Sequence, residues 1–81
     1  MWVTIRLFAS HREAAGRESL IVELADGATA ADALARACSE APSLANAVTS
    51  VAYALNREQV SADAPLHDGD ELALLPPVAG G

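Results

Sequence analysis

Apolar and polar residues alternate at several places along the chain, with the two-residue period of a strand that buries one face. The clearest case is the stretch 3–9, where Val3, Ile5 and Leu7 fall on one side. Similar stretches predict strands at residues 19–24, 51–56 and 71–75, and a short edge strand is expected around 58–60. Only a connector or single helical turn, stopped by Gly16, separates the first two strands, so we expect them to pair as a hairpin.

One longer segment has the 3.6-residue spacing of a helix. Thr29 and Asp32 resemble a capping box in which Asp replaces the usual Glu. The apolar stripe predicted on this alanine-rich helix consists of Ala30, Leu34, Ala37, Cys38 and Ala41. Pro42 is expected to end the helix, and a further short helix is expected within residues 43–49.

The order of these elements is strand, strand, main helix, short helix and three strands. It predicts an α+β domain, a mixed sheet with one main helix packed on one face. The β-grasp, or ubiquitin-like, fold has this order. We expect a single domain at residues 1–75 and a projecting, flexible C-terminal tail at residues 76–81, with the sequence Pro-Pro-Val-Ala-Gly-Gly.

The composition narrows the possible partners. Hydrophobic residues make up 52% of the chain, which excludes a disordered protein. The net charge is -6 and the five basic residues are all arginines, so nucleic acid is excluded and a basic protein surface is the expected partner. No apolar run approaches the ~20 residues of a membrane span, so we expect a cytoplasmic protein that does not contact membranes.

Few side chains of this chain suit catalysis or metal binding. Cys38 lies on the predicted helix stripe, where a buried and inert thiol is expected. His11 and His67 have no carboxylate or cysteine set at ligand spacing, so no metal site is expected and both are interpreted as surface or turn residues. Residues 68–71, Asp-Gly-Asp-Glu, resemble part of a calcium loop but are expected to shape the turn before the last strand.

Most small domains end in a frayed polar segment, whereas this sequence ends in two glycines. With glycine at about 7% of residues, a terminal pair arises by chance in roughly 0.5% of chains. A Gly-Gly end lets a narrow channel admit bare backbone and bring the carboxylate of Gly81 to a reaction centre. Because a carboxylate is a poor electrophile, it needs prior activation, for instance as an acyl-adenylate. The alternative is a disordered end of no consequence.

Two motifs make the chain similar to a known family. Residues 7–16 match the pattern L-F-A-x-x-R-E-x-x-G, and residues 66–71 with 76–81 match L-x-D-G-D-E…P-P-V-x-G-G. On these motifs the chain resembles the small, sulfur-carrier subunits of molybdopterin synthase (MoaD), within the wider MoaD/ThiS family of ubiquitin-like carriers. The resemblance covers essentially the whole chain. Within the first motif, Arg12 and Glu13 are expected to take part in a structural ion pair near the first turn.

The resemblance implies a cycle of sulfur transfer. An E1-like adenylating enzyme activates Gly81 with MgATP, and a sulfur donor protein supplies the sulfur of a thiocarboxylate. The large subunit of molybdopterin synthase then passes this sulfur to cyclic pyranopterin monophosphate, which forms the dithiolene of molybdopterin. The resemblance also implies a heterotetramer of two small and two large subunits. The residues that thread the partner's active site would be Pro76, Pro77, Val78, Ala79 and Gly80. The chain itself is expected to bind no cofactor and not to be catalytic alone, because the acids and bases belong to its partners.

The chain departs from the family just before the tail. Many members carry aromatic residues there, whereas this chain has Leu74 and Leu75. Alternation requires one of the two to face away from the core. Either Leu75 forms an apolar docking patch with Ala73 and Phe8, or it packs under the sheet edge, and the sequence leaves both interpretations open.

Three other functions also stay open. The chain could be a sulfur carrier with the same chemistry in another pathway, to thiamine, cysteine or another sulfur-containing product. A protein modifier would be joined through Gly81 to lysines of other proteins and would form adducts of higher mass. A non-covalent β-grasp binding module would survive deletion of Gly80 and Gly81, whereas a carrier would be inactivated by it.

Overall fold

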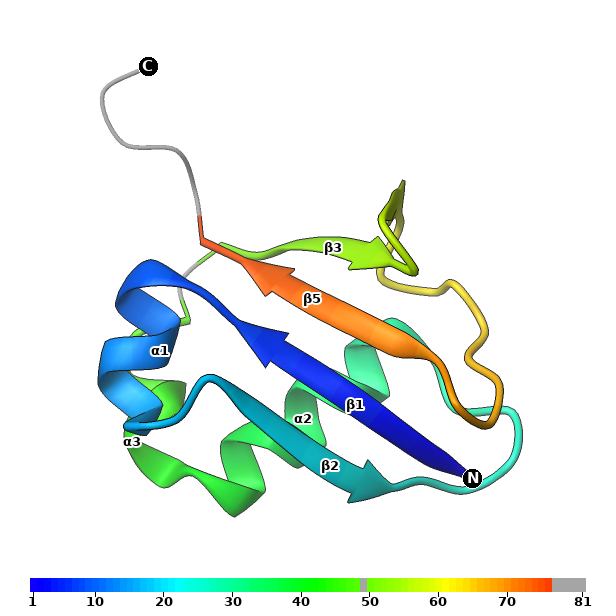
Figure 1. Ribbon diagram of the computed structural model, residues 1–81, viewed down its shortest axis with the longest axis horizontal. Helices are drawn as coiled ribbons and strands as arrows, with labels where there is room; N and C mark the ends of the chain where they lie inside the picture. Colours follow the sequence, from blue (N-terminus) through cyan, green and yellow to red (C-terminus); the bar gives the residue numbers. More distant parts are fainter. Residues whose placement is uncertain (49, 77–81) are drawn as a thin grey trace.

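The computed structural model describes residues 1–48 and 50–76, which form a five-stranded sheet and three helices (Figure 1). The strands are β1 (Trp2–Leu7), β2 (Ser19–Glu23), β3 (Ala52–Leu55), β4 (Glu58–Val60) and β5 (Glu71–Leu75). The helices are α1 (Ala9–Ala15), α2 (Ala30–Glu40) and α3 (Pro42–Ala45). All five predicted strands and the main helix are therefore confirmed. The first strand is shorter than predicted because the chain turns into α1 after Phe8.

The strands lie in the order β2-β1-β5-β3-β4. The central pair, β1 and β5, is parallel, and every other neighbouring pair is antiparallel, including the predicted β1–β2 hairpin. The mixed sheet carries α2 across one face, which confirms the predicted α+β, β-grasp architecture. Trp2 begins β1 at one end of the sheet, and β5 finishes at the other end, where Pro76 follows (Figure 1).

The core lies between the sheet and the helices. Its largest fully buried side chains come mainly from the central strands and α3, and include Ile5, Leu44, Leu72 and Leu74. The buried residues of α2 are all alanines, at positions 30, 33 and 37. The predicted stripe is therefore confirmed, since Ala30, Ala37 and Ala41 are buried and Leu34 and Cys38 pack half-buried against the core; only Ala33 was missed. Alanine side chains are small enough for the helix backbone to approach the strands closely.

Local hydrogen bonds explain where the elements begin and end. Thr29 and Asp32 form the predicted capping box, in which the Asp32 amide donates to the Thr29 hydroxyl at 3.3 Å and the Thr29 amide donates to the Asp32 carboxylate at 2.9 Å. Gly16 ends α1 with a φ of 72°, a left-handed conformation that suits glycine. Asp70 accepts a hydrogen bond from the His67 amide at 2.7 Å, so the acidic segment shapes the turn before β5, as predicted.

Two further findings concern charge and membranes. The expected ion pair near the first turn joins Arg12 to Glu18, at 4.0 Å between the guanidinium and the carboxylate. Glu13 was the wrong partner to expect, because neighbouring residues on a helix point in different directions. No helix in the described part of the chain is both long and apolar enough to cross a membrane.

Candidate functional site

The candidate site begins where β5 delivers the chain to Pro76. Along β5 the buried and half-buried residues alternate: Leu72 and Leu74 enter the core, whereas Ala73 and Leu75 lie on the opposite face. Pro76, the first residue of the predicted tail, is half-buried. The other predicted tail residues lie outside the described part of the chain; they are Pro77, Val78, Ala79, Gly80 and Gly81.

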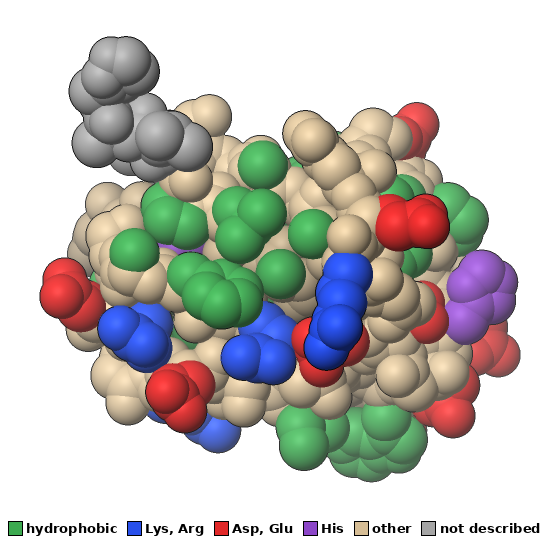
Figure 2. Space-filling model, turned by 45° about the horizontal axis from the view of Figure 1, so that its top comes forward, with side chains coloured by type: hydrophobic (Ala, Val, Ile, Leu, Met, Phe, Trp, Pro, Cys, Tyr) green, Lys and Arg blue, Asp and Glu red, His purple; other side chains and the backbone are tan. Residues whose placement is uncertain are grey.

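The face of the sheet opposite α2 carries an apolar surface at this end. The register pairs Leu7 of β1 with Leu74 of β5, so Phe8 and Leu75 follow one residue further along at the same end. On the other side, β3 places Ala54 opposite Ala73 and Ala52 opposite Leu75. We call this surface the outer patch; it consists of Phe8, Ala52, Ala54, Ala73 and Leu75. Figure 2 shows apolar side chains gathered on this face next to the end of the described chain.

The structure thus brings together the three residues that the sequence suggested for docking. Phe8 is 36% exposed, and Leu75 stays outside the core. The interpretation in which Leu75 packs beneath the sheet edge is therefore wrong, because strand alternation turns it to the open face. The two alanines of β3 were missed, since their place beside β5 depends on long-range pairing that the sequence does not display.

Arg6 borders the outer patch and fixes its aromatic member. Its guanidinium carbon lies 5.6 Å from the centroid of the Phe8 ring, within the range of a cation–π contact. The same guanidinium lies 3.6 Å from the carboxylate of Glu71. The outer patch is therefore bounded on this side by an ion pair of two partly exposed side chains.

His11 lies beneath this site and corrects the expectation of a surface or turn residue. It is 0% exposed, and its Nδ1 lies 3.3 Å from the carbonyl oxygen of Leu74. Its Nε2 is buried without a hydrogen-bond partner in the described part of the chain. The signal for burial was present in the helical spacing, because Ala15, four residues later in α1, also packs against the core. His11 therefore joins α1 to β5 one residue before Leu75.

The remaining candidate groups stay apart from the outer patch. Cys38 of α2 is half-buried, and burial raises the pKa of its thiol, which keeps the thiol protonated and agrees with the expectation of an inert residue. His67 is exposed at the other end of the sheet, and its Nδ1 lies 3.9 Å from a carboxylate oxygen of Asp70. Within residues 1–48 and 50–76, no three His, Cys, Asp or Glu side chains converge into a group that could hold a metal ion.

Together, these features define a ubiquitin-like β-grasp domain whose last strand leads past an apolar patch into a Gly-Gly terminus. Comparison with known proteins identifies the family: the chain belongs to the ThiS family, whose model matches residues 5–81. It is 39% identical over 83 residues to the molybdopterin synthase sulfur carrier subunit of Chlamydomonas reinhardtii, with all of both chains covered.

Solved structures show the same fold. The crystal structure of small archaeal modifier protein 1 from Haloferax volcanii superposes with a TM-score of 0.89 at 30% identity, covering 95% of this chain and 98% of that one. A second similar structure is that of a complex of subunits 1 and 2 of the molybdopterin-converting factor from Helicobacter pylori. It matches with a TM-score of 0.68 at 30% identity, and all of both chains is covered.

The packing of His11 yields a prediction about stability. His11→Ala should lower the free energy of unfolding by about 2–4 kcal/mol, because it leaves a cavity beneath β5. His11→Leu should cost less than about 1.5 kcal/mol, because it fills the space and removes the unpaired Nε2. Urea unfolding followed by circular dichroism measures the free energy of unfolding of both variants. Equal losses in the two variants would mean that the hydrogen bond to Leu74, rather than packing, holds α1 in place.

The raised pKa of the Cys38 thiol yields a second prediction. Since the thiolate is the reactive form, iodoacetamide should alkylate Cys38 of the folded chain at least about threefold more slowly than in the urea-unfolded chain near neutral pH. The folded-state rate should rise steadily as the pH approaches and passes the ordinary thiol value of 9.0. Intact-mass spectrometry follows the reaction, with Cys38→Ser as the blank. Faster alkylation in the folded chain would contradict the inert interpretation.

Proposed function

We propose that this chain is a sulfur carrier that works through the carboxylate of Gly81 in the synthesis of molybdopterin. The observation that carries the proposal is the 39% identity, over the whole of both chains, to a relative named as a molybdopterin synthase sulfur carrier subunit. The match of the ThiS family model through residue 81 supports extending the likeness to the Gly-Gly terminus.

The chemistry follows from the weakness of a carboxylate as an electrophile. In the proposed cycle, a carboxylate oxygen of Gly81 attacks the α-phosphorus of MgATP on a cytoplasmic E1-like enzyme, and pyrophosphate leaves. The outer sulfur of a persulfide on a donor protein then attacks the acyl carbon and displaces AMP, which gives an acyl disulfide between Gly81 and the donor. A second thiol of the protein partners attacks the donor-side sulfur, so that a disulfide forms and the thiocarboxylate of Gly81 is released. In this cycle MgATP is a substrate of the activating enzyme, and the carrier itself requires no cofactor.

The outer patch is the proposed docking surface for the large subunit of the synthase. It adjoins Pro76, so a partner that covers Phe8, Ala73 and Leu75 also receives the tail. The Helicobacter pylori complex, in which a similar chain is the partner of a second subunit, supports such an assembly. Sulfur would pass there from Gly81 to cyclic pyranopterin monophosphate, and the acids and bases of that step would belong to the large subunit.

A second candidate function has a specific observation in its favour. The likeness to small archaeal modifier protein 1, at a TM-score of 0.89, supports a protein modifier that is joined through Gly81 to lysine side chains. Both functions begin with the same adenylation and differ in the acceptor, which is a sulfur nucleophile for the carrier and an amine for the modifier. Carriers for thiamine or cysteine differ only in the final acceptor of the sulfur.

Removal of the last two residues tests the proposed function. Without Gly80 and Gly81, the chain should lose all sulfur transfer in a mixture of activating enzyme, MgATP, sulfur donor, large subunit and pterin substrate. Its circular dichroism spectrum and unfolding midpoint should match those of the full chain. Persistent activity of the truncated chain would refute a carrier role and favour a non-covalent module. Adducts of higher mass on other proteins would favour the modifier.

The outer patch yields a prediction about docking. Leu75→Asp should weaken binding to the large subunit by about 10- to 100-fold, because it places a charge where about 1.5–3 kcal/mol of apolar burial is lost. Isothermal titration calorimetry measures the affinity. Ile21→Asp is the matched control, because Ile21 is exposed on the same face but lies outside the outer patch. Unchanged affinity of the Leu75 variant would remove the patch from the docking surface.

A further inference from the structure

A second apolar surface lies on the open face, away from the outer patch. Trp2 and Ile21 are 54% and 68% exposed, and both are large hydrophobic side chains. The register of β1 with β2 pairs Trp2 with Glu23 and Thr4 with Ile21, so Trp2 and Ile21 are diagonal neighbours on one face. We call these two residues the Trp2–Ile21 surface.

An ion pair separates the two apolar surfaces. Arg6 and Glu71, 3.6 Å apart, lie in adjacent strands between Trp2 at the start of β1 and Leu75 at the end of β5. Figure 2 shows charged side chains between the apolar groups next to the grey segment and a separate apolar group at the lower edge. The five steps of β1 from Trp2 to Leu7 amount to roughly 16 Å. The Trp2–Ile21 surface is thus distinct from the proposed docking surface.

Trp2 is held in place rather than frayed. Its amide donates a hydrogen bond to the Asp68 carboxylate at 2.7 Å, and its carbonyl accepts one from the Gly69 amide at 2.8 Å. The preceding ammonium of Met1 donates to the carbonyl of Leu24 at 2.8 Å. A contact residue whose backbone is fixed before binding loses less conformational entropy on binding, and tryptophan is over-represented among residues that dominate binding energy.

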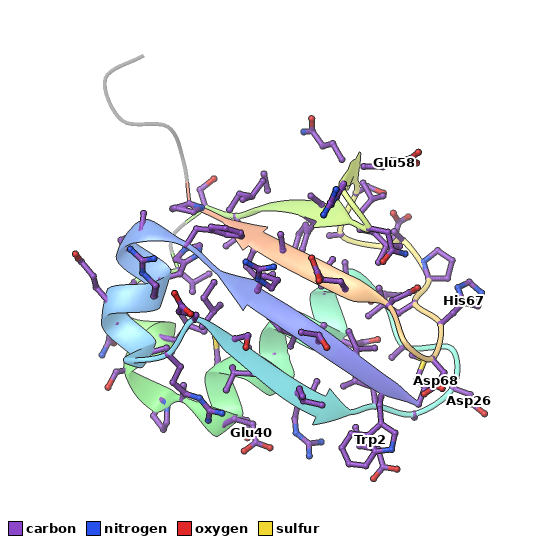
Figure 3. All side chains as sticks on the ribbon, in the orientation of Figure 1. Trp2, Asp26, Glu40, Glu58, His67 and Asp68 are labelled. Atoms are coloured by element: carbon purple, nitrogen blue, oxygen red, sulfur yellow. The ribbon has the colours of Figure 1, made fainter. Side chains whose placement is uncertain are left out.

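The surroundings of Trp2 are acidic. Glu23 faces it across the hairpin, and Asp68 binds its amide. Beside them lies an open hollow of about 270 Å³, lined by Asp26, Asp68, His67 and Met1 among others. Figure 3 shows Trp2, Asp26, His67 and Asp68 at the same end of the molecule. The carboxylates of Glu23, Asp26 and Asp68 outnumber the single ammonium of Met1 at this end. The hollow therefore suits a cationic side chain, while the indole suits an apolar one.

We propose that the Trp2–Ile21 surface and this hollow bind a cationic protein segment that carries a leucine-like side chain next to an arginine or lysine. A second copy of the chain is disfavoured as the occupant, because each copy has a net charge of -6 and would present the same acidic rim. The location leaves the outer patch and Pro76 free, so such a partner binds while the tail is engaged elsewhere. This inference does not depend on the proposed function.

The experiment uses the only tryptophan of the chain as its reporter, since Trp2 lies in the surface itself. The full chain is titrated with three acetylated, amidated peptides: Arg-Leu-Ala-Arg-Leu, Arg-Ser-Ala-Arg-Ser and Glu-Leu-Ala-Glu-Leu. The first should shift the fluorescence to the blue in a saturable manner and bind about tenfold more tightly than the second, because only it adds apolar burial to charge. The acidic peptide should leave the tryptophan emission unchanged, and added salt should weaken the binding of the first peptide.

Two variants and an NMR map of the contact residues test whether the peptide binds at the Trp2–Ile21 surface. Ile21→Ser should lower the affinity for the first peptide about three- to tenfold, whereas Leu75→Ser should leave that affinity unchanged. Amide chemical-shift changes in NMR spectra should cluster around Trp2, Ile21 and Asp68. Equal affinity for the two basic peptides, shifts centred on the outer patch, or a blue shift on concentrating the chain alone would each overturn the proposal.

Discussion

The parallel pairing of β1 with β5 is the contact on which the rest of the structure depends. It joins residues near the start of the chain to residues near the end of the described chain, as in the hydrogen bond from the Thr4 amide to the Asp70 carbonyl at 3.0 Å. Closing so long a loop costs conformational entropy, which the burial of Ile5, Leu72 and Leu74 offsets. Because the register is fixed there, a slip of one residue would turn Leu74 outward and Leu75 inward.

The same pairing positions the candidate site. It brings Phe8 next to Leu75 on the open face, and it brings His11 beneath the carbonyl of Leu74 on the buried side. Pro76 therefore leaves the sheet beside an apolar surface on a rigid support. In the proposed function the domain supplies the docking surface and Gly81 supplies the reacting carboxylate, whereas the partners supply the acids and bases.

Much of this fold follows from local patterns in the sequence. The bounds of β4 and β5 agree with the alternation and turn signals, and the capping box at Thr29 marks the start of α2. These features depend on neighbours within a few residues of each other, which a single sequence displays.

Features that depend on distant contacts were not predictable in the same way. The contact of His11 with the Leu74 carbonyl needs β5 beside α1, and the alanines of the outer patch are defined only by the register of β3 with β5. The terminal Gly-Gly pair suggested that the carboxylate of Gly81 is the working group, whereas its role in sulfur transfer came from motifs shared with a family. Trp2 was not among the candidate residues, because its surroundings depend on the pairing of β1 with β2 and on the turn at Asp68.

Mass spectrometry of the C-terminal peptide tests the central claim most directly. Trypsin cuts last after Arg57 and releases residues 58–81, a peptide that excludes the oxidisable Met1, Trp2 and Cys38. In protein from its own host, or after incubation with the activating enzyme, MgATP and a sulfur donor, we expect a peptide heavier by about 16 Da, with the change confined to Gly81, because sulfur replaces one oxygen. A peptide that stays unmodified under both conditions, with no acyl-adenylate formed, would contradict the sulfur-carrier role.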